Sequence, residues 1–295
     1  MTPAPDPARD ARRTVYALLI TLAVGVTAGR ILSTERLSEP SVHRRDSDTA
    51  PRPAWPKARP EPSPTFSSND RSRWALARAL VEEGTFVIGR RDRMVVLASG
   101  PAVLAAADPV QAWALLAAGY QARVASDHGV IFEDGWQSVD KVLHPTTLDY
   151  YSTKPPLLSL LAAGEYWILR TAFGWSMSER PFAVVLTTVA TLNLLPLIVY
   201  LAILAALAER FGRSDWGRYY LVAAGGFATL VTPFLISLNN HTPAAALVAV
   251  AVYAAVRIAD GGGGGWYALA GLTTGLAVCN RAAGGGWGAR CSSIC

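Results

Sequence analysis

The chain of 295 residues has few charged side chains. Asp, Glu, Lys and Arg together make up 17% of the sequence, whereas soluble domains contain roughly 25%, and hydrophobic residues make up 51%. This scarcity of charge excludes an ordinary soluble protein of this length. It indicates a membrane protein.

The sequence also lacks a folded polar segment on which basic residues cluster. Its formal net charge is +5, but many of the arginines and lysines lie in a proline-rich segment or beside apolar runs. Basic residues placed in this way are typical of membrane topology signals and not of a nucleic-acid-binding surface. We therefore expect membrane lipids, and no nucleic acid, among the partners.

Cysteine is nearly absent. The chain has three cysteines, none before Cys279, and both Cys291 and Cys295 fall within the last five residues. They belong to the glycine-rich ending NRAAGGGWGARCSSIC, residues 280–295, which follows a short apolar run. We expect this irregular tail to be a truncated or frame-shifted end, with a genuine short tail as the alternative.

Five apolar runs are candidates for crossing a bilayer, which requires about 20 residues each. They are residues 14–32, 181–208, 219–238, 243–258 and 266–279. Arg9, Arg12 and Arg13 precede the first run, so we expect residues 1–13 to stay in the cytoplasm. A cleaved signal peptide is the alternative, but Arg30 and the lack of a small-x-small site favour an uncleaved anchor.

Residues 33–68 contain seven prolines and few apolar residues, which predicts a disordered linker. A loop domain over residues 69–154 follows. It opens with a predicted amphipathic helix that begins at Asp70, carries Trp74 and Ala77 on its apolar face and ends at Gly84. The runs TFVIG and RMVVLA, residues 85–89 and 93–98, then flank a charged turn and suggest a hairpin.

Residues 155–173 are long enough to span, but Glu165 and Arg170 lie within them. Each would cost about 2.5 to 3.5 kcal/mol near the bilayer centre, so we expect a helix that lies in the membrane interface. The next span, residues 181–208, then runs inward and places Arg210, Arg213 and Arg218 in the cytoplasm. The loop domain and Lys154 consequently lie on the outer side, at the membrane surface.

The motif YSTKPPLL at residues 151–158, after a first span and a large loop that begins with an acidic helix, carries a family resemblance. The sequence FEDGWQSVDKVLHP at residues 132–145 also resembles a subgroup of uncharacterised bacterial membrane proteins with this layout. Over about residues 69–280 the chain resembles the N-terminal half of the GT-C glycosyltransferases that use polyprenyl-phosphate sugars, such as the lipid A aminoarabinose transferases and protein O-mannosyltransferases.

That resemblance implies an all-α, polytopic protein of the bacterial cytoplasmic (inner) membrane with a periplasmic loop domain. It also implies that the acidic residue of the loop, Asp70, is the catalytic base or a metal contact. Lys154 would lie near the lipid phosphate, and the sugar donor would be a polyprenyl-phosphate-linked sugar.

The chemistry supports the same residues independently of the family. Sugar transfer from a lipid phosphate to a hydroxyl needs a carboxylate to accept a proton and a cation to neutralise the leaving phosphate. Asp70 and Lys154 supply one of each, and the candidate substrate-binding residues are Arg71, Arg73, Tyr151 and His241.

Each candidate also has a structural alternative: Asp70 as a favourable charge in the first turn of a helix, Lys154 as a snorkelling side chain and His241 as a capping residue. A metal site made from Glu133, Asp134, Asp140 and His144 rests on residue types that often share a loop by chance, so we predict no metal or other cofactor.

The sequence thus predicts a membrane glycosyltransferase, or an inactive truncated form of one. The alternative is a non-catalytic membrane protein with a lipid-binding or assembly role. A transporter is disfavoured because the spans hold few ionisable residues, and Asn193 with Pro196 is the main polar break in a long span.

Overall fold

The computed structural model describes residues 7–34, 63–91, 94–97, 103–105, 114, 117–118, 121–124, 127–133 and 135–281. These residues form two compact units, which are described separately. The helical unit contains residues 7–34 and 183–281, and the mixed unit contains the described residues from 63 to 182. Most of the predicted linker and nearly all of the predicted irregular tail lie outside the described residues.

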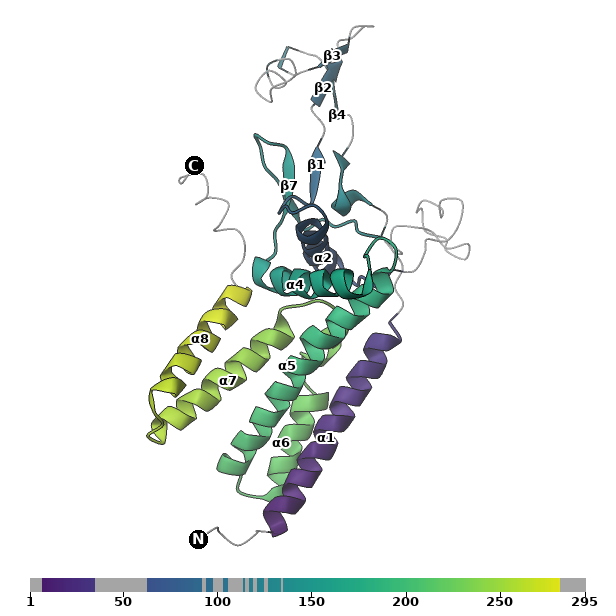
Figure 1. Cartoon of the computed structure of the whole chain (residues 1–295). Helices are drawn as coiled ribbons and strands as arrows, with labels where there is room; N and C mark the ends of the chain where they lie inside the picture. Colours follow the sequence, from purple (N-terminus) through teal and green to yellow (C-terminus); the bar gives the residue numbers. More distant parts are fainter. Residues whose placement is uncertain are drawn as a thin grey trace, which may run out of the picture. The chain divides into compact units, whose positions relative to one another are not determined.

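The helical unit contains α1 (Pro7–Leu32), α5 (Pro181–Phe211), α6 (Asp215–Phe227), the 3-10 helix η2 (Thr232–Ile236), α7 (His241–Ala259) and α8 (Gly264–Arg281) (Figure 1). Of the helices described, α1, α5 and α7 are long and apolar enough to cross a membrane. The predicted spans 14–32, 181–208 and 243–258 are therefore helices of that kind. The predicted span 266–279 lies in α8, which does not reach the same length and apolarity.

The predicted span 219–238 is wrong as a continuous helix. Helix α6 ends at Phe227, and the chain bends before the short η2 begins at Thr232. A continuous helix would carry Pro233 in its interior, where the missing backbone N–H and the clash with the carbonyl four residues earlier break a helix. Less than half of this apolar run thus lies in α6, a helix of 13 residues and about 20 Å.

Side chains of neighbouring helices bind the backbone of this break. The Asn193 amide nitrogen in α5 donates to the carbonyls of Leu235 and Ser237, at 2.8 and 3.0 Å. Asn239 donates to the Ser237 carbonyl at 3.1 Å, and Arg30 in α1 donates to the Thr232 carbonyl at 3.3 Å. Non-helical backbone at membrane depth is tolerated where protein groups satisfy it in this way.

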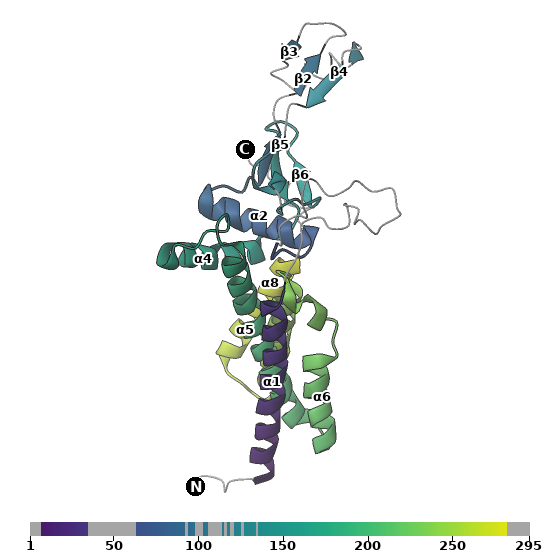
Figure 2. The ribbon, with the colours of Figure 1, turned by 90° about the vertical axis from the view of Figure 1, so that its right-hand side faces the viewer.

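Helices α1, α5 and α6 pack through small and aliphatic residues. One buried cluster joins Ala23 of α1 to Leu197 and Leu201 of α5 and to Leu235 of η2. Helix α6 comes close to its neighbours at Gly226, where an added Cβ would lie 3.1 Å from the Cβ of Ala23. Figures 1 and 2 both show α6 beside α1. Small residues allow this close approach between helices.

Polar contacts identify the two ends of the helical unit. At one end, which we call the arginine end, Arg12 of α1 contacts Glu209 of α5 at 2.8 Å, and Arg210 pairs with Asp260 after α7. At the opposite end, the side-chain amides of Asn240 and Asn280 each donate to the other's backbone carbonyl, at 2.8 and 3.0 Å. This reciprocal amide pair joins the start of α7 to the end of α8.

The described part of the mixed unit contains α2, α4, the 3-10 helix η1 (Val130–Phe132) and two antiparallel sheets, so the prediction of an all-α fold holds only in part. One sheet has the order β5-β1-β7-β6. The other has the order β3-β2-β4 (Figure 2). The strands are β1 (Gly89–Arg91), β2 (Met94–Leu97), β3 (Val103–Ala105), β4 (Gln121–Val124), β5 (Asp127–His128), β6 (Lys141–Leu143) and β7 (Asp149–Ser152).

The predicted hairpin is also wrong. Strand β1 pairs with β5 and β7, whereas β2 pairs with β3 and β4, so the two runs belong to different sheets. The run 93–98 contains β2, whereas only Gly89 of the run 85–89 belongs to a strand. The pairings of β1 with β5 and β7, and of β2 with β4, join segments more than 20 residues apart, which local periodicity does not report.

Helix α2 (Ser68–Glu82) begins two residues before the predicted start, and Ser67 caps it. We expected one buried face, but every residue from Asp70 to Ala79 is buried. The polar face is covered because its side chains bond to the surrounding loops. Arg78, for example, contacts Glu133 at 2.5 Å and Glu82 at 2.9 Å. Helix α2 is therefore the central element of the mixed unit.

Helix α4 (Pro156–Phe173) follows the predicted helix 155–173 closely. Pro156 occupies its first position, where no backbone donor is needed, and Gly174 ends it at a φ of 66°. One face packs on α2, and the Tyr166 hydroxyl donates to Glu82 at 2.5 Å. The opposite face carries exposed apolar side chains: Leu160, Leu161, Trp167 and Ile168. An exposed apolar stripe beside charged flanks is typical of an interfacial helix.

Candidate functional site

Lys154 lies at the start of the candidate site, between β7 and α4. Its backbone N–H donates to the Ser152 hydroxyl at 3.2 Å, and Pro155 follows it. Its Nζ lies 2.7 Å from Oδ1 of Asp140, and the two side chains are 18% and 23% exposed. Lys154 therefore does not extend freely toward solvent as a snorkelling side chain would. It is held by a carboxylate from the loop before β6.

Asp70 lies in the first turn of α2 and is 2% exposed. Its Oδ2 accepts the backbone N–H of Phe66 at 2.7 Å, while its own N–H donates to the Ser67 hydroxyl at 3.4 Å. This reciprocal arrangement resembles a capping box, in which a side chain three residues into the helix reaches back. Asp70 thus has the helix-start role that the sequence left open as an alternative.

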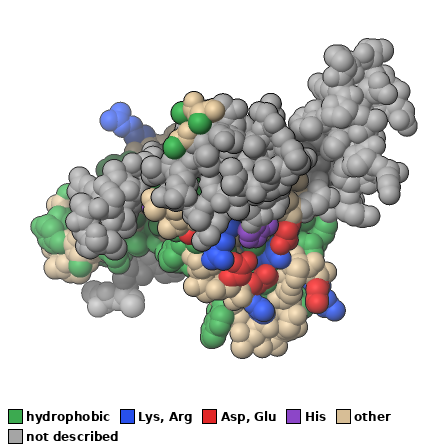
Figure 3. Space-filling view, turned by 90° about the horizontal axis from the view of Figure 1, so that it is seen from above, with side chains coloured by type: hydrophobic (Ala, Val, Ile, Leu, Met, Phe, Trp, Pro, Cys, Tyr) green, Lys and Arg blue, Asp and Glu red, His purple; other side chains and the backbone are tan. Residues whose placement is uncertain are grey.

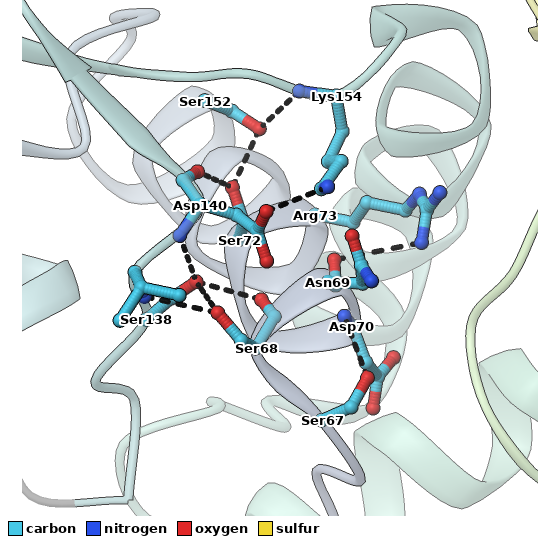
Figure 4. Close-up of polar contacts among 11 residues, drawn as sticks. Ser67, Ser68, Asn69, Asp70, Ser72, Arg73, Ser138, Asp140, Ser152 and Lys154 are labelled. Carbon is cyan, nitrogen blue, oxygen red and sulfur yellow. Dashed lines mark hydrogen bonds and ion pairs between the residues drawn. The ribbon is translucent and has the colours of Figure 1, made fainter.

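Arg73 links Asp70 to the Lys154–Asp140 pair, because its guanidinium is influenced by both carboxylates. It is buried on α2, and its Nη1 lies 3.5 Å from the Asn69 carbonyl. Burial lowers the pKa of the Arg73 guanidinium, and the negative charges of Asp70 and Asp140 oppose that shift. Both carboxylates therefore act on one guanidinium. We call Asp70, Arg73, Asp140 and Lys154 the polar cluster (Figure 4).

Neighbouring cations of the polar cluster also lower the pKa of Asp140. Burial alone would raise it, but hydrogen bonds from Lys154 and Ser68, together with the charges of Lys154 and Arg73, lower it below the usual value. Asp140 is therefore a carboxylate held ionised by two cations. Because its side chain is 23% exposed, it is the more accessible of the two carboxylates in the cluster.

Five serines fix the cluster in place (Figure 4). The Ser72 hydroxyl of α2 donates to the Asp140 carbonyl at 2.6 Å and contacts the Ser152 hydroxyl at 2.7 Å. Ser68 and Ser138 contact each other at 2.8 Å, and Ser138 accepts the backbone N–H of Asp140 at 3.0 Å. With Ser67 at the helix start, these hydroxyls join α2 to the loop before β6 and to the end of β7. Short side chains with few rotatable bonds suit a preorganised site.

The remaining predicted site residues have separate positions. Arg71 is buried and donates to the Gln137 carbonyl at 3.1 Å, so it joins α2 to the loop before β6. Tyr151 is half-buried on β7, and burial raises its pKa with a further contribution from Asp149. His241 is exposed and belongs to the helical unit, where it begins α7. Within the mixed unit the structure thus brings Asp70, Arg73 and Lys154 together, whereas His241 belongs to the helical unit.

Sequence reasoning missed Asp140 as the partner of Lys154. The two residues are 14 positions apart in the chain, and the serines of α2 that help to align them lie about 70 positions before them. No spacing rule connects such positions.

No group of three or more His, Cys, Asp or Glu residues close enough to hold a metal ion occurs among the residues that the structure describes. Of the residues considered for a metal site, Asp134 lies outside the described residues and Glu133 pairs with Arg78. The polar cluster itself contains two cations and two carboxylates, and each of its carboxylates acts on a cation of the cluster.

A second charged region lies on the sheet that contains β1, β5 and β7. Arg91 pairs with Asp127 at 3.0 Å, and Arg90 pairs with Asp149 at 3.2 Å. Figure 3 shows acidic and basic side chains intermingled on the described part of this view. The described basic side chains of this sheet are thus balanced by carboxylates. They form no uniform positive surface there.

Comparisons with protein-family models, with curated proteins and with solved structures find no match to this chain.

Proposed function

We propose that this chain is a membrane glycosyltransferase of the GT-C type, which transfers a sugar from a polyprenyl-phosphate carrier to an acceptor on the outer face of the cytoplasmic membrane. The observation that carries this proposal is the polar cluster. It places two cations and two carboxylates together immediately before α4, a helix with an exposed apolar stripe. A phosphate attached to a membrane lipid would meet such a site at the bilayer surface.

The geometry supports a division of roles. Lys154 and Arg73 neutralise the lipid phosphate, which takes Lys154 from Asp140 as it binds. The released Asp140 carboxylate then accepts the proton of the acceptor hydroxyl. The acceptor oxygen forms a bond to the anomeric carbon, and the bond from that carbon to the phosphate oxygen breaks, so that the electron pair leaves with the phosphate. Asp70, which the sequence predicted as the base, holds Arg73 and the helix start.

The proposed topology follows from the distribution of arginine. Seven arginines lie at or near the arginine end of the helical unit: Arg9, Arg12, Arg13, Arg210, Arg213, Arg218 and Arg257. Arg30 and Arg281 lie toward the other end. Because lysine and arginine near membrane helices remain in the cytoplasm, the N-terminus is cytoplasmic and the mixed unit is on the outer side.

Cysteine labelling tests this topology. In a background with Cys279, Cys291 and Cys295 replaced by serine, Val139→Cys and Arg213→Cys each supply one exposed thiol. A membrane-impermeant maleimide should label Val139→Cys in intact cells and Arg213→Cys only after permeabilisation. The reverse pattern would show that the mixed unit is cytoplasmic, and it would refute the outer-face reaction.

The catalytic proposal is tested with the purified full-length chain and a panel of polyprenyl-phosphate sugars, by following release of polyprenyl phosphate. Lys154→Ala and Asp140→Asn should each lower turnover by about 10²- to 10⁴-fold, as loss of a catalytic acid–base or electrostatic group does. Lys154→Arg should keep partial activity, because the charge remains while the geometry changes. The control is Arg90→Gln, since Arg90 is exposed and pairs with Asp149 on another surface.

Asp70→Asn separates the two carboxylates. If Asp70 positions Arg73 and caps α2, this variant should lose stability and turnover together. If it abolishes turnover at unchanged stability while Asp140→Asn retains turnover, Asp70 is the base and the roles must be exchanged. Near-normal turnover of both Lys154→Ala and Asp140→Asn would refute the enzyme proposal.

A non-catalytic membrane protein with a lipid-binding or assembly role is the second candidate. It is favoured by the structural bonds of the two key residues, namely the helix-start contact of Asp70 and the ion pair of Lys154. In that case the parent chain would turn over none of the donors. Lys154→Ala would then change only the stability of the mixed unit.

A further inference from the structure

A cavity that takes no part in the proposed reaction lies at the arginine end of the helical unit. Its volume is about 540 Å³, within the range of roughly 300–1,000 Å³ typical of small-molecule sites. Helices α1, α5 and α7 line it through Arg9, Arg13, Tyr16, Ala205, Ala206, Glu209, Arg210, Tyr253, Val256 and Arg257. These are the three helices long and apolar enough to cross a membrane.

The lining is amphipathic. Ala205 and Ala206 of α5 are small, and together with Val256 of α7 they form an apolar part of the wall. Tyr16 and Tyr253 add aromatic rings, and four arginines supply the charge. Small residues on α5 leave space between helices whose ends are held together by the Arg210–Asp260 pair. The cavity therefore exists because α5 has small alanine side chains where it faces α7.

The acidic groups near the cavity already have cationic partners. Glu209 accepts both the Arg12 guanidinium, at 2.8 and 3.2 Å, and the Tyr16 hydroxyl, at 2.7 Å. Asp260 pairs with Arg210, and Asp10 lies 3.8 Å from Arg13.

Two of the lining arginines, Arg13 and Arg257, are exposed. The side chain of Arg13 is 63% exposed. The Arg257 guanidinium lies over the ring of Trp266 at 5.4 Å, a contact that uses its face and not its N–H groups. With four arginines and one glutamate in the lining, the cavity attracts anions.

We propose that this cavity binds the phosphate headgroup of an anionic phospholipid in the leaflet on the arginine side of the membrane. Arginine binds phosphate through two parallel N–H groups, and basic pockets between membrane helices suit anionic headgroups. The apolar wall of Ala205, Ala206 and Val256 accommodates the start of an acyl chain. A free phosphate ion shares the headgroup chemistry but would leave that wall without a ligand.

This inference rests on the membrane character of α1, α5 and α7 and not on the proposed reaction. Its test uses the delipidated, full-length chain in detergent, with phosphatidylglycerol, phosphatidylcholine and inorganic phosphate as separate probes. Native mass spectrometry should detect tight binding of phosphatidylglycerol, with phosphatidylcholine at least about tenfold weaker, because only the first has a net charge. Inorganic phosphate at millimolar concentration should not displace the lipid.

Variants distinguish a site from general surface charge. The double variant Arg13→Gln/Arg257→Gln should weaken phosphatidylglycerol binding by about tenfold or more, since it removes two charge-assisted contacts. Arg213→Gln is the matched control, because Arg213 lies at the same end but does not line the cavity, and it should bind as the parent does. Ala206→Phe fills the cavity without changing the charge and should also weaken binding.

Helix content by circular dichroism confirms that each variant is folded. Equal binding of the two lipids, or equal losses in Arg213→Gln and the double variant, would overturn the proposal. Displacement of the lipid by inorganic phosphate would identify a small-anion site and would likewise overturn it. The failure of the glycosyltransferase assay would leave this result unaffected.

Discussion

Asn193 gives a quantitative test of the helical unit. The substitution Asn193→Leu keeps the side-chain size but removes both hydrogen bonds to the backbone between α6 and α7. The Ser237 carbonyl keeps the Asn239 amide at 3.1 Å, so the loss falls mainly on the Leu235 carbonyl. Leaving one buried carbonyl unsatisfied costs about 1–3 kcal/mol. Measured hydrogen bonds in membrane proteins average about 0.6 and reach about 1.7 kcal/mol.

We therefore expect Asn193→Leu to destabilise the folded chain by about 1–2 kcal/mol, a change of roughly 5- to 30-fold in the unfolding equilibrium constant. Asn193→Asp should cost at least as much, because a carboxylate would face two carbonyl oxygens without a donor. The assay is unfolding of the purified protein by increasing SDS in mixed micelles, followed by circular dichroism.

Thr191→Val is the matched control on the same helix. Its hydroxyl bonds only to the Thr187 carbonyl within α5, so its removal should change stability by less than about 0.5 kcal/mol. If Asn193→Leu proves as stable as the parent and as Thr191→Val, then Asn193 does not support the broken helix. The reasoning from unsatisfied backbone groups would be refuted.

Two further predictions concern the mixed unit. The pKa of Asp127 is lowered mainly by its hydrogen bond from Arg91, and the pKa of Asp140 is lowered by Lys154 against the effect of burial. Since both folded values lie below the unfolded one of about 3.9, the stabilisation is complete above about pH 4 and is lost as pH falls through the folded values. Thermal unfolding from pH 7 to pH 3 should show this loss. The double variant Asp127→Asn/Asp140→Asn should lose less stability on acidification, whereas the control Glu179→Gln, at an exposed residue, should behave as the parent. An unchanged loss in the double variant would contradict the view that these two carboxylates cause the acid sensitivity. Gly129 has a φ of 101°, and an added Cβ would lie 2.7 Å from the Gly89 Cα, so Gly129→Ala should lower stability by about 1–3 kcal/mol. Gly164→Ala, in a helix with open space, should be neutral or stabilising in the same thermal assay, and equal effects of both alanines would rule out the close approach.

The sequence was most informative where a single local pattern decides the structure. The long apolar runs predicted α1, α5 and α7, and the two prolines after Lys154 predicted the start of α4. The break after α6 was missed because average apolarity conceals one proline, Pro233, in a run of otherwise suitable residues. Apolar composition reports membrane affinity and does not report backbone continuity.

The candidate site shows the same division. Asp70 and Lys154 could be selected by residue type and position, and the structure places both in the polar cluster. Asp140 and the serines could not, because their proximity depends on how β7 and the loop before β6 fold against α2. The sequence also predicted an exposed face on α2. The loops that cover this helix contact it from residues 55 to 70 positions away, beyond the reach of helical periodicity.

The reciprocal amide pair between Asn240 and Asn280 has a consequence for how the chain enters a membrane. The turn at Gly261 connects α7 and α8 at one end, and the amide pair joins them at the other. Helix α8 is less apolar than α7, so it gains less from entering lipid alone. The amide pair gives partners to two polar side chains and two backbone carbonyls that would be costly to leave unsatisfied in lipid. We therefore predict that α7 and α8 enter a membrane together, as one hairpin.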